Sequence, residues 1–161
     1  MGERYAGIVT SDRATAYDTR PLRTRQLCGA HLARDFQAMI ERGGPARPVG
    51  EALLEHAHGL FAWWHWVRDG TWTRSTFQQY VRTLRASFRL ELEQGRACGC
   101  PKTAATCREL LTREAALWTF VRVEGIEPTN NAAEVRSVDQ KPRLTNSEDW
   151  SVGERRKLLV A

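Results

Sequence analysis

The chain has 161 residues, of which 42% are hydrophobic and 27% are charged, a composition typical of about one globular domain. No apolar run approaches the roughly 20 residues of a membrane helix and the first residues carry no signal-peptide pattern, so a cytoplasmic protein without a membrane partner is expected. The formal charge of +5 favours polyanionic partners, nucleic acid above all. The four cysteines are then expected to be thiols or metal ligands rather than disulfides.

The first predicted element is a strand over residues 6–10, which ends in a β-branched run. Asp12 follows this strand at once. Ligands and metals meet α/β sheets just beyond the carboxyl ends of strands, so Asp12 is predicted to be one half of a metal site, with Glu134 as the other half. The alternative is that Asp12 caps a short helix over 13–17. Asp18 is expected to be a solvated turn residue.

A second short strand is predicted over 24–28. An amphipathic helix is predicted over 29–40, because apolar residues recur there at helical spacing. Glycine and proline residues within 43–48 are expected to end this helix in a loop.

Cys28 and His31 stand three apart at the start of this helix, a spacing that can offer two ligands to zinc. A structural zinc site needs four ligands; the candidates for the other two are Cys98, Cys100 and Cys107. One hypothesis is therefore a zinc site on Cys28, His31, Cys98 and Cys100. The alternative is that Cys28 is a small core residue and His31 a hydrogen-bonded one.

Residues 50–121 are predicted to be helical, with helices over 50–68, 75–94 and 103–121. The second is expected to open with a capping box at 75–78. Aromatic residues of the first helix recur at core spacing, which predicts a packed helix–helix seam; stacking of bases on its tryptophans is the alternative. The outer face of the second helix, expected to be solvated or to face phosphates, carries Arg74, Arg82, Arg85 and Arg89.

The second informative stretch is GIEPTNNAAEVR at 125–136. Asn131 can cap a new helix, and its spacing to Glu134 fits a reciprocal capping box. The functional alternative is a helix that carries the Glu134 carboxylate toward a metal, with Asn130 and Asn131 at its start.

Three blocks of this chain together resemble the catalytic region of bacterial insertion-sequence-66 transposases. They are YAGIVTSDRATAY, QLCGAHLARDFQ and GIEPTNNAAE. In that family a strand ends in Asp followed closely by Tyr, a Cys-x-x-His-Leu-x-Arg-x-Phe block comes next, and a helical insertion precedes an Asn-Asn-x-x-Glu motif. The order and the spacing of the blocks both match over about residues 5–134.

The resemblance implies an α/β protein with an incomplete ribonuclease H-like fold, one or two short strands and a large helical insertion, mostly α by residue count. It implies an Asp-Asp-Glu active site in which Asp12 is similar to the second Asp and Glu134 to the Glu. Asn130 and Asn131 match the family's Asn pair, and Arg34 belongs to its second block.

The family's activity is metal-dependent DNA cleavage and strand transfer, in which Asp12 and Glu134 would hold Mg²⁺ or Mn²⁺. Carboxylate oxygens suit these hard ions, and two metal ions can stabilise both the attacking and the leaving oxygen of a phosphodiester. The implied partners are DNA, as transposon ends and target, and further copies of the chain, because exposed strand edges invite association.

Two departures from the family pattern shape the expected domains. The family's first Asp lies on an upstream strand and has no counterpart here, and the match is lost after Glu134. We therefore expect a partial catalytic domain over 1–136, with an insertion over about 48–122, and a divergent, disordered tail over 137–161. The predicted protein is a truncated transposase that is inactive alone; the alternative is a non-catalytic basic helical module that binds nucleic acid or a transposase partner.

Overall fold

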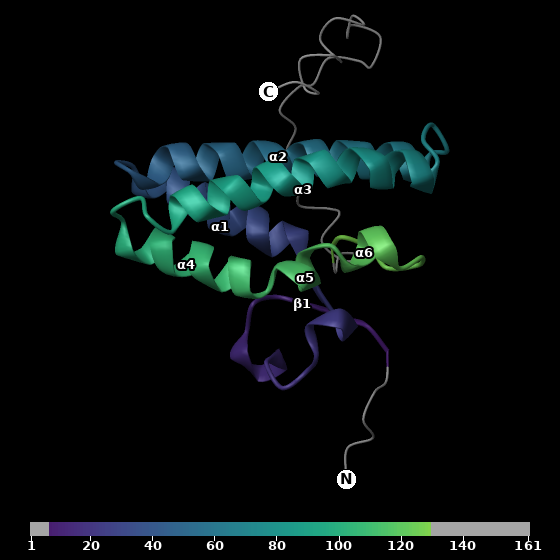
Figure 1. Ribbon diagram of the computed structural model, residues 1–161, viewed down its shortest axis with the longest axis horizontal. Helices are drawn as coiled ribbons and strands as arrows, with labels where there is room; N and C mark the ends of the chain where they lie inside the picture. Colours follow the sequence, from purple (N-terminus) through teal and green to yellow (C-terminus); the bar gives the residue numbers. More distant parts are fainter. Residues whose placement is uncertain (1–6, 130–161) are drawn as a thin grey trace, which may run out of the picture. The chain divides into compact units, whose positions relative to one another are not determined.

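The computed structural model describes residues 7–129 (Figure 1). Helix predominates among them, as predicted. The elements in chain order are β1 (Val9–Ser11), the 3₁₀ turns η1 (Thr15–Tyr17) and η2 (Leu22–Thr24), β2 (Arg25–Leu27), α1 (Gly29–Arg42), α2 (Ala46–Arg68), α3 (Arg74–Gly95), α4 (Pro101–Thr112), α5 (Glu114–Leu117) and α6 (Thr119–Arg122). No helix in this part of the chain is long and apolar enough to cross a membrane. The predicted tail over 137–161 lies outside the described residues.

The two strands form a small parallel sheet, in which Val9 pairs with Arg25 and Ser11 with Leu27. β2 lies within the predicted range of 24–28. β1 begins later than the predicted strand and ends at Ser11, directly before Asp12. The sheet therefore delivers Asp12 at the carboxyl end of a strand, as the sequence predicts.

Side chains join β2 to the segment that contains α5 and α6. The Gln26 amide is fully buried; its Nε2 donates to the carbonyl oxygen of Leu117 at 3.2 Å, and its Oε1 accepts the N–H of Phe120 at 2.9 Å. The Thr119 hydroxyl donates to the carbonyl oxygen of Arg25 at 2.6 Å. Because buried polar groups need partners, these bonds fix the sheet against the helical part.

The helices pack in sequence order, α1 on α2, α2 on α3 and α3 on α4 (Figure 1). Gly50 allows the first of these contacts, because a Cβ there would lie 2.7 Å from the carbonyl oxygen of Phe36. Trp64 of α2 is buried, with its ring 5.5 Å from that of Phe77 on α3 and 5.3 Å from that of Phe120 on α6. The predicted aromatic seam is confirmed.

Three helix boundaries differ from the predicted ones. α2 already begins at Ala46, because Pro48 lies in its first turn, where a missing N–H costs nothing. α3 is capped by Thr73, whose hydroxyl oxygen accepts the N–H of Thr76 at 3.1 Å, so the predicted capping box at 75–78 is wrong. The predicted helix over 103–121 is broken at Arg113 and Trp118 into α4, α5 and α6.

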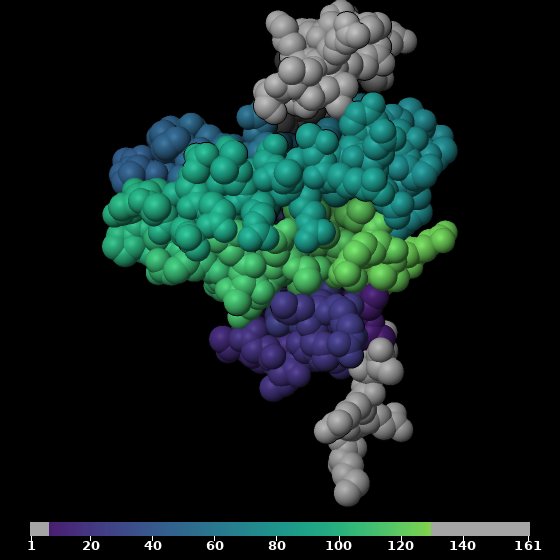
Figure 2. Space-filling model, in the orientation of Figure 1, coloured from purple at the N-terminus to yellow at the C-terminus, as the bar shows by residue number. Residues whose placement is uncertain are grey.

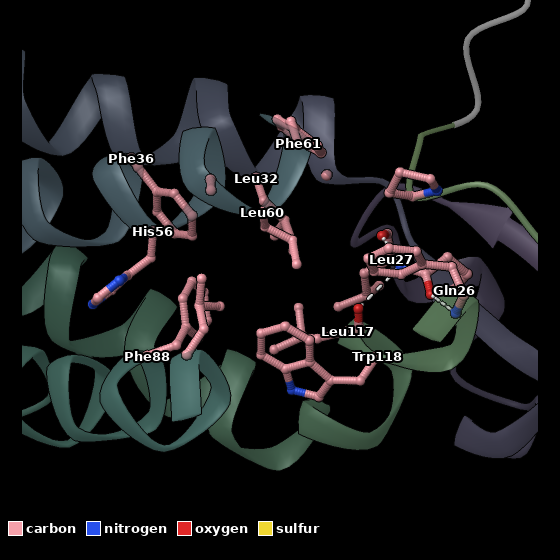
Figure 3. A pocket seen from close by; sticks show the side chains of 15 residues that line it. Gln26, Leu27, Leu32, Phe36, His56, Leu60, Phe61, Phe88, Leu117 and Trp118 are labelled. Carbon is pink, nitrogen blue, oxygen red and sulfur yellow. Dashed lines mark hydrogen bonds between the residues drawn. The ribbon is translucent and has the colours of Figure 1, made fainter. Parts of the chain in front are cut away.

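A cavity of about 30 Å³ lies where α1, α2 and α3 meet the α5–α6 segment (Figure 3). Its wall is mainly apolar and includes Leu32, Phe36, Leu60, Phe61, Phe88 and Trp118. An apolar cavity of this size offers a water molecule too few polar partners. The cavity is therefore a gap in the packing of the core rather than a ligand site.

His56 is the titratable side chain at the wall of this cavity, with its ring 6.3 Å from that of Phe88. Burial lowers the pKa of His56 below its ordinary value, although the charges of Glu91 and Glu55 oppose this shift. The unfolded chain therefore takes up a proton at His56 more readily than the folded protein, so the free energy of unfolding should fall as the pH drops below about 6.5.

The expected result is that His56→Gln reduces the loss of stability between about pH 7.5 and pH 5.5. Urea unfolding at both pH values measures it, and His58→Gln, an exposed position on the same helix, is the control. An equal pH dependence in wild type and His56→Gln would contradict the prediction.

Candidate active site

Asp12 is exposed at the end of β1. Its Oδ1 accepts the N–H of Ala14 at 3.0 Å, which makes a local turn, and η1 begins only at Thr15 with Ala14 as its N-cap. Asp12 is therefore not the helix cap of the alternative interpretation. Within residues 7–129 its carboxylate forms no ion pair, and Oδ2 has no hydrogen-bond partner, so this oxygen is available to a ligand.

The loop that follows Asp12 is held by a network of ion pairs. Arg13 donates from Nε to Asp35 of α1 at 2.9 Å and from Nη1 to Glu109 of α4. Arg113 also binds Glu109, and its Nη1 donates to the carbonyl oxygen of Arg13 at 2.9 Å. The residue next to Asp12 is thus held by two helices, and Figure 2 shows this N-terminal segment lying directly against the α4–α6 segment.

Asp18 completes this network. Its Oδ1 lies 2.8 Å from Nη2 of Arg113 and 3.1 Å from Nη1 of Arg25, whose side chain is buried. Asp18 lies in a turn and is 43% exposed, as predicted, and it is in addition an ion-pair partner. No local pattern could indicate it, because Asp18 and Arg113 are 95 positions apart.

Burial opposes the charged form of Arg13, but the hydrogen bond and charge of Asp35, followed by those of Glu109, outweigh it and raise the pKa of Arg13. All three carboxylates of this network, Asp18, Asp35 and Glu109, face arginines. Asp12 differs from them in facing no cation among the described residues.

The segment before the Asn-Asn-x-x-Glu motif comes back to the end of β1. The N–H of Cys28 donates to the carbonyl oxygen of Ser11 at 2.8 Å, and the N–H of Gly29 donates to that of Pro128 at 2.8 Å. Gly29 is needed for this approach, because a Cβ there would lie 2.7 Å from the Phe61 ring and 3.2 Å from the Pro128 oxygen. The carboxyl end of β1 and the segment around Pro128 are therefore joined through the consecutive residues Cys28 and Gly29.

Residues 1–141 match the model of the Transposase IS66 family. The chain belongs to the IS66 family of transposases. A transposase role and a DNA partner follow from this membership. No curated protein and no solved structure gives a significant match.

Three of the predicted site residues of this IS66 transposase, Asn130, Asn131 and Glu134, lie outside the described residues. Arg34 lies on α1 and is exposed. Cys28 is buried at the N-terminus of the same helix. The roles of Arg34 and Glu134 in a site with Asp12 stay predictions.

The structure does not bring the four residues of the zinc hypothesis together. No group of three or more His, Cys, Asp or Glu side chains within residues 7–129 is placed to hold a metal ion. Cys28 and His31 lie at the N-terminus of α1, whereas Arg42 at its C-terminus donates to the Thr103 hydroxyl at 2.6 Å, near Cys100. A helix of 14 residues is about 20 Å long, so the two halves of the candidate site lie far apart. Among the described residues, the buried Nδ1 of His31 has no hydrogen-bond partner.

Most of the arginines on the outer face of α3 form contacts within the protein. Arg85 and Arg89 both bind Glu114 at 2.7 Å. Arg74 donates to the carbonyl oxygen of Phe120 at 2.9 Å. These contacts give three of the four arginines a structural role in the transposase, and they reduce the positive charge that this face offers to phosphates.

Proposed function

We propose that Asp12 and Glu134 are carboxylate ligands of Mg²⁺ or Mn²⁺ in a site that cleaves and joins DNA during transposition. The observation that carries this proposal is the position of Asp12. It is exposed at the carboxyl end of β1 and faces no cation among residues 7–129, whereas the neighbouring carboxylates Asp18, Asp35 and Glu109 are paired with arginines. A free carboxylate oxygen at a strand end is the ligand that Mg²⁺ prefers.

The contact between Gly29 and Pro128 supports the partnership of Asp12 with Glu134. Six positions separate Pro128 from Glu134; six residues span about 9 Å as a helix and at most about 22 Å when extended. Pro128 is bonded to Gly29, the residue after the one that bonds Ser11, so the part of the chain that leads to Glu134 starts beside the strand end that carries Asp12.

Bound divalent ions would stabilise the attacking and leaving oxygens of the phosphodiester. The contribution of the chain is to orient the ligands. Arg13 and Arg113 hold the loop behind Asp12, and the 28–29 backbone joins this loop to the segment that leads to Glu134. Neither carboxylate acts as a nucleophile in this proposal; water and then a DNA 3′-hydroxyl attack.

We propose that β1 and β2 belong to a ribonuclease H-like sheet within a catalytic region over 1–136, with α2, α3 and α4 in the insertion. Among the described residues β1 pairs only with β2, so its other edge is open to a further strand. A strand that carries the family's first Asp would bring the third carboxylate to this edge. Without this third carboxylate, we expect the 161 residues to bind metal but not to cut DNA. We also propose that the open edge of β1 can pair with a second copy of the chain. We propose a cytoplasmic location for this activity.

Metal binding to the purified chain tests this proposal. We expect Mn²⁺ binding, measured by electron paramagnetic resonance, to weaken about tenfold or more in Asp12→Asn and in Glu134→Gln, because each variant removes a charged oxygen ligand. Glu51→Gln is the matched control, because this exposed carboxylate pairs with Arg47 on α2 and lies outside the network that holds the Asp12 loop.

Unchanged Mn²⁺ binding in both variants would overturn the proposed site. Incubation with supercoiled plasmid and Mn²⁺ tests the need for a third carboxylate. We expect no nicking by the wild-type chain. Nicking that both Asp12→Asn and Glu134→Gln abolish would support the site and show that two carboxylates suffice.

A further inference from the structure

The turn between α3 and α4 brings two cysteines together. Cys98 and Cys100 are separated by Gly99, whose φ of 74° and the bend at this point fold the chain back on itself. Both thiols are free and half-buried, and the Cys98 thiol reaches across Gly99 to the carbonyl oxygen of Cys100 at 4.0 Å. A turn at the intervening residue allows two cysteines at this spacing to approach to the roughly 4.4–6.8 Å between Cα atoms that a disulfide spans.

Cys100 occupies the N-cap position of α4, where unpaired N–H groups and the helix dipole favour an anion. The hydroxyl and the N–H of Thr103 lower the pKa of the Cys100 thiol, with smaller contributions from the N–H of Lys102 and the charge of Arg42. Arg42 donates to the oxygen of the same Thr103 hydroxyl, which leaves the hydroxyl hydrogen free to point at sulfur.

The other two cysteines, Cys28 and Cys107, lie in a different environment. Cys28 and Cys107 are buried, with at most 1% of their surface exposed. Burial, and next the nearby Cys98, raise the pKa of the Cys107 thiol to about 11. Thiolates react and thiols do not, so burial protects Cys107, whereas Cys100 is partly accessible and its thiol is activated.

We propose that Cys98 and Cys100 form a redox-active dithiol that reacts with low-molecular-weight disulfides. The Cys100 thiolate attacks one sulfur of the disulfide, which breaks its S–S bond and releases one thiol that takes the proton of Cys100. The Cys98 thiol then attacks the sulfur of Cys100, which releases the second thiol together with the proton of Cys98. Two cysteines are oxidised to a disulfide, and two electrons reduce the small disulfide to two thiols.

A disulfide between Cys98 and Cys100 would close a small ring that contains only Gly99 between the two cysteines. Such a ring is strained, and strained disulfides are readily reduced. The Cys98–Cys100 bond would therefore open again when reduced thiols predominate. This site is independent of the proposed metal site, because it lies at the other end of α4 from Glu109 and Arg113.

The reduced full-length chain, treated with oxidised glutathione under native conditions, tests the proposal. Trypsin cleaves after Arg96 and Lys102, so one peptide, 97–102, contains both cysteines, while Cys28 and Cys107 fall in other peptides. We expect this peptide to lose two hydrogens in mass, and the peptides with Cys28 and Cys107 to stay reduced. In Cys98→Ser, glutathione should remain on Cys100; in Cys100→Ser, the reaction of Cys98 should be about tenfold slower.

A wild-type chain that keeps glutathione on Cys100 without forming the internal disulfide would overturn the proposal. Equal reaction of Cys28 or Cys107 under the same conditions would do so as well. Thr103→Val in the Cys98→Ser background provides a further readout: it should slow the reaction of Cys100, whereas Thr103→Ser, which keeps the hydroxyl, should not. Circular dichroism of each variant verifies the fold, and equal rates for the two Thr103 variants would count against the assigned role of Thr103.

Discussion

Replacement of Phe36 by alanine is expected to lower the free energy of unfolding by about 3–5 kcal/mol. Phe36 is fully buried on α1, and its ring meets that of Phe88 on α3 edge to face, with centroids 5.9 Å apart. It also lines the existing cavity, so the space left by the ring would enlarge a gap that the surrounding helices already fail to close. Urea unfolding followed by circular dichroism measures the effect.

Leu90→Ala is the matched control for this variant. Leu90 lies on α3 and is 57% exposed, so its truncation should change the free energy of unfolding by no more than about 0.5 kcal/mol. A loss below about 1.5 kcal/mol for Phe36→Ala would mean that α1 does not pack on α3 as described.

Arg113→Met is expected to cost about 2–3 kcal/mol, below the range for fully buried pairs because Asp18 is 43% exposed. Arg113 is only 13% exposed, and it binds Asp18, Glu109 and the carbonyl oxygen of Arg13. Methionine keeps the length of the side chain and removes all three contacts. The backbone amides of residues 13–18 should then exchange hydrogen faster, because the loop that follows Asp12 is no longer bonded to the end of α4.

The control is Arg85→Met, which breaks an ion pair with Glu114 at a side chain that is 46% exposed. Its expected cost is at most about 1 kcal/mol. If Arg113→Met costs no more than Arg85→Met and leaves the exchange of the 13–18 amides unchanged, the network does not position the loop that carries Asp12.

Local patterns in the sequence predicted the elements well where apolar spacing was regular. The helices α1, α2 and α3 and the strand β2 follow from such spacing, because an amphipathic face can be recognised within a few turns. The boundaries were harder to predict: Thr73 rather than Ser75 caps α3, and Arg113 interrupts the last predicted helix. At Arg113 the side chain binds residues near the start of the chain, which no local pattern encodes.

The sequence by itself determined the family, through three short blocks with the right order and spacing, and it placed Asp12 directly after a strand. The tertiary structure alone decided which charges meet: Arg13 pairs with Glu109 across 96 positions, and Asp18 with Arg113 across 95. It also decided which predicted ligands do not meet, because α1 separates Cys28 and His31 from Cys98 and Cys100. The physical reason is the range of the interactions: strand and helix patterns act between near neighbours, whereas ion pairs and metal sites depend on how distant segments pack.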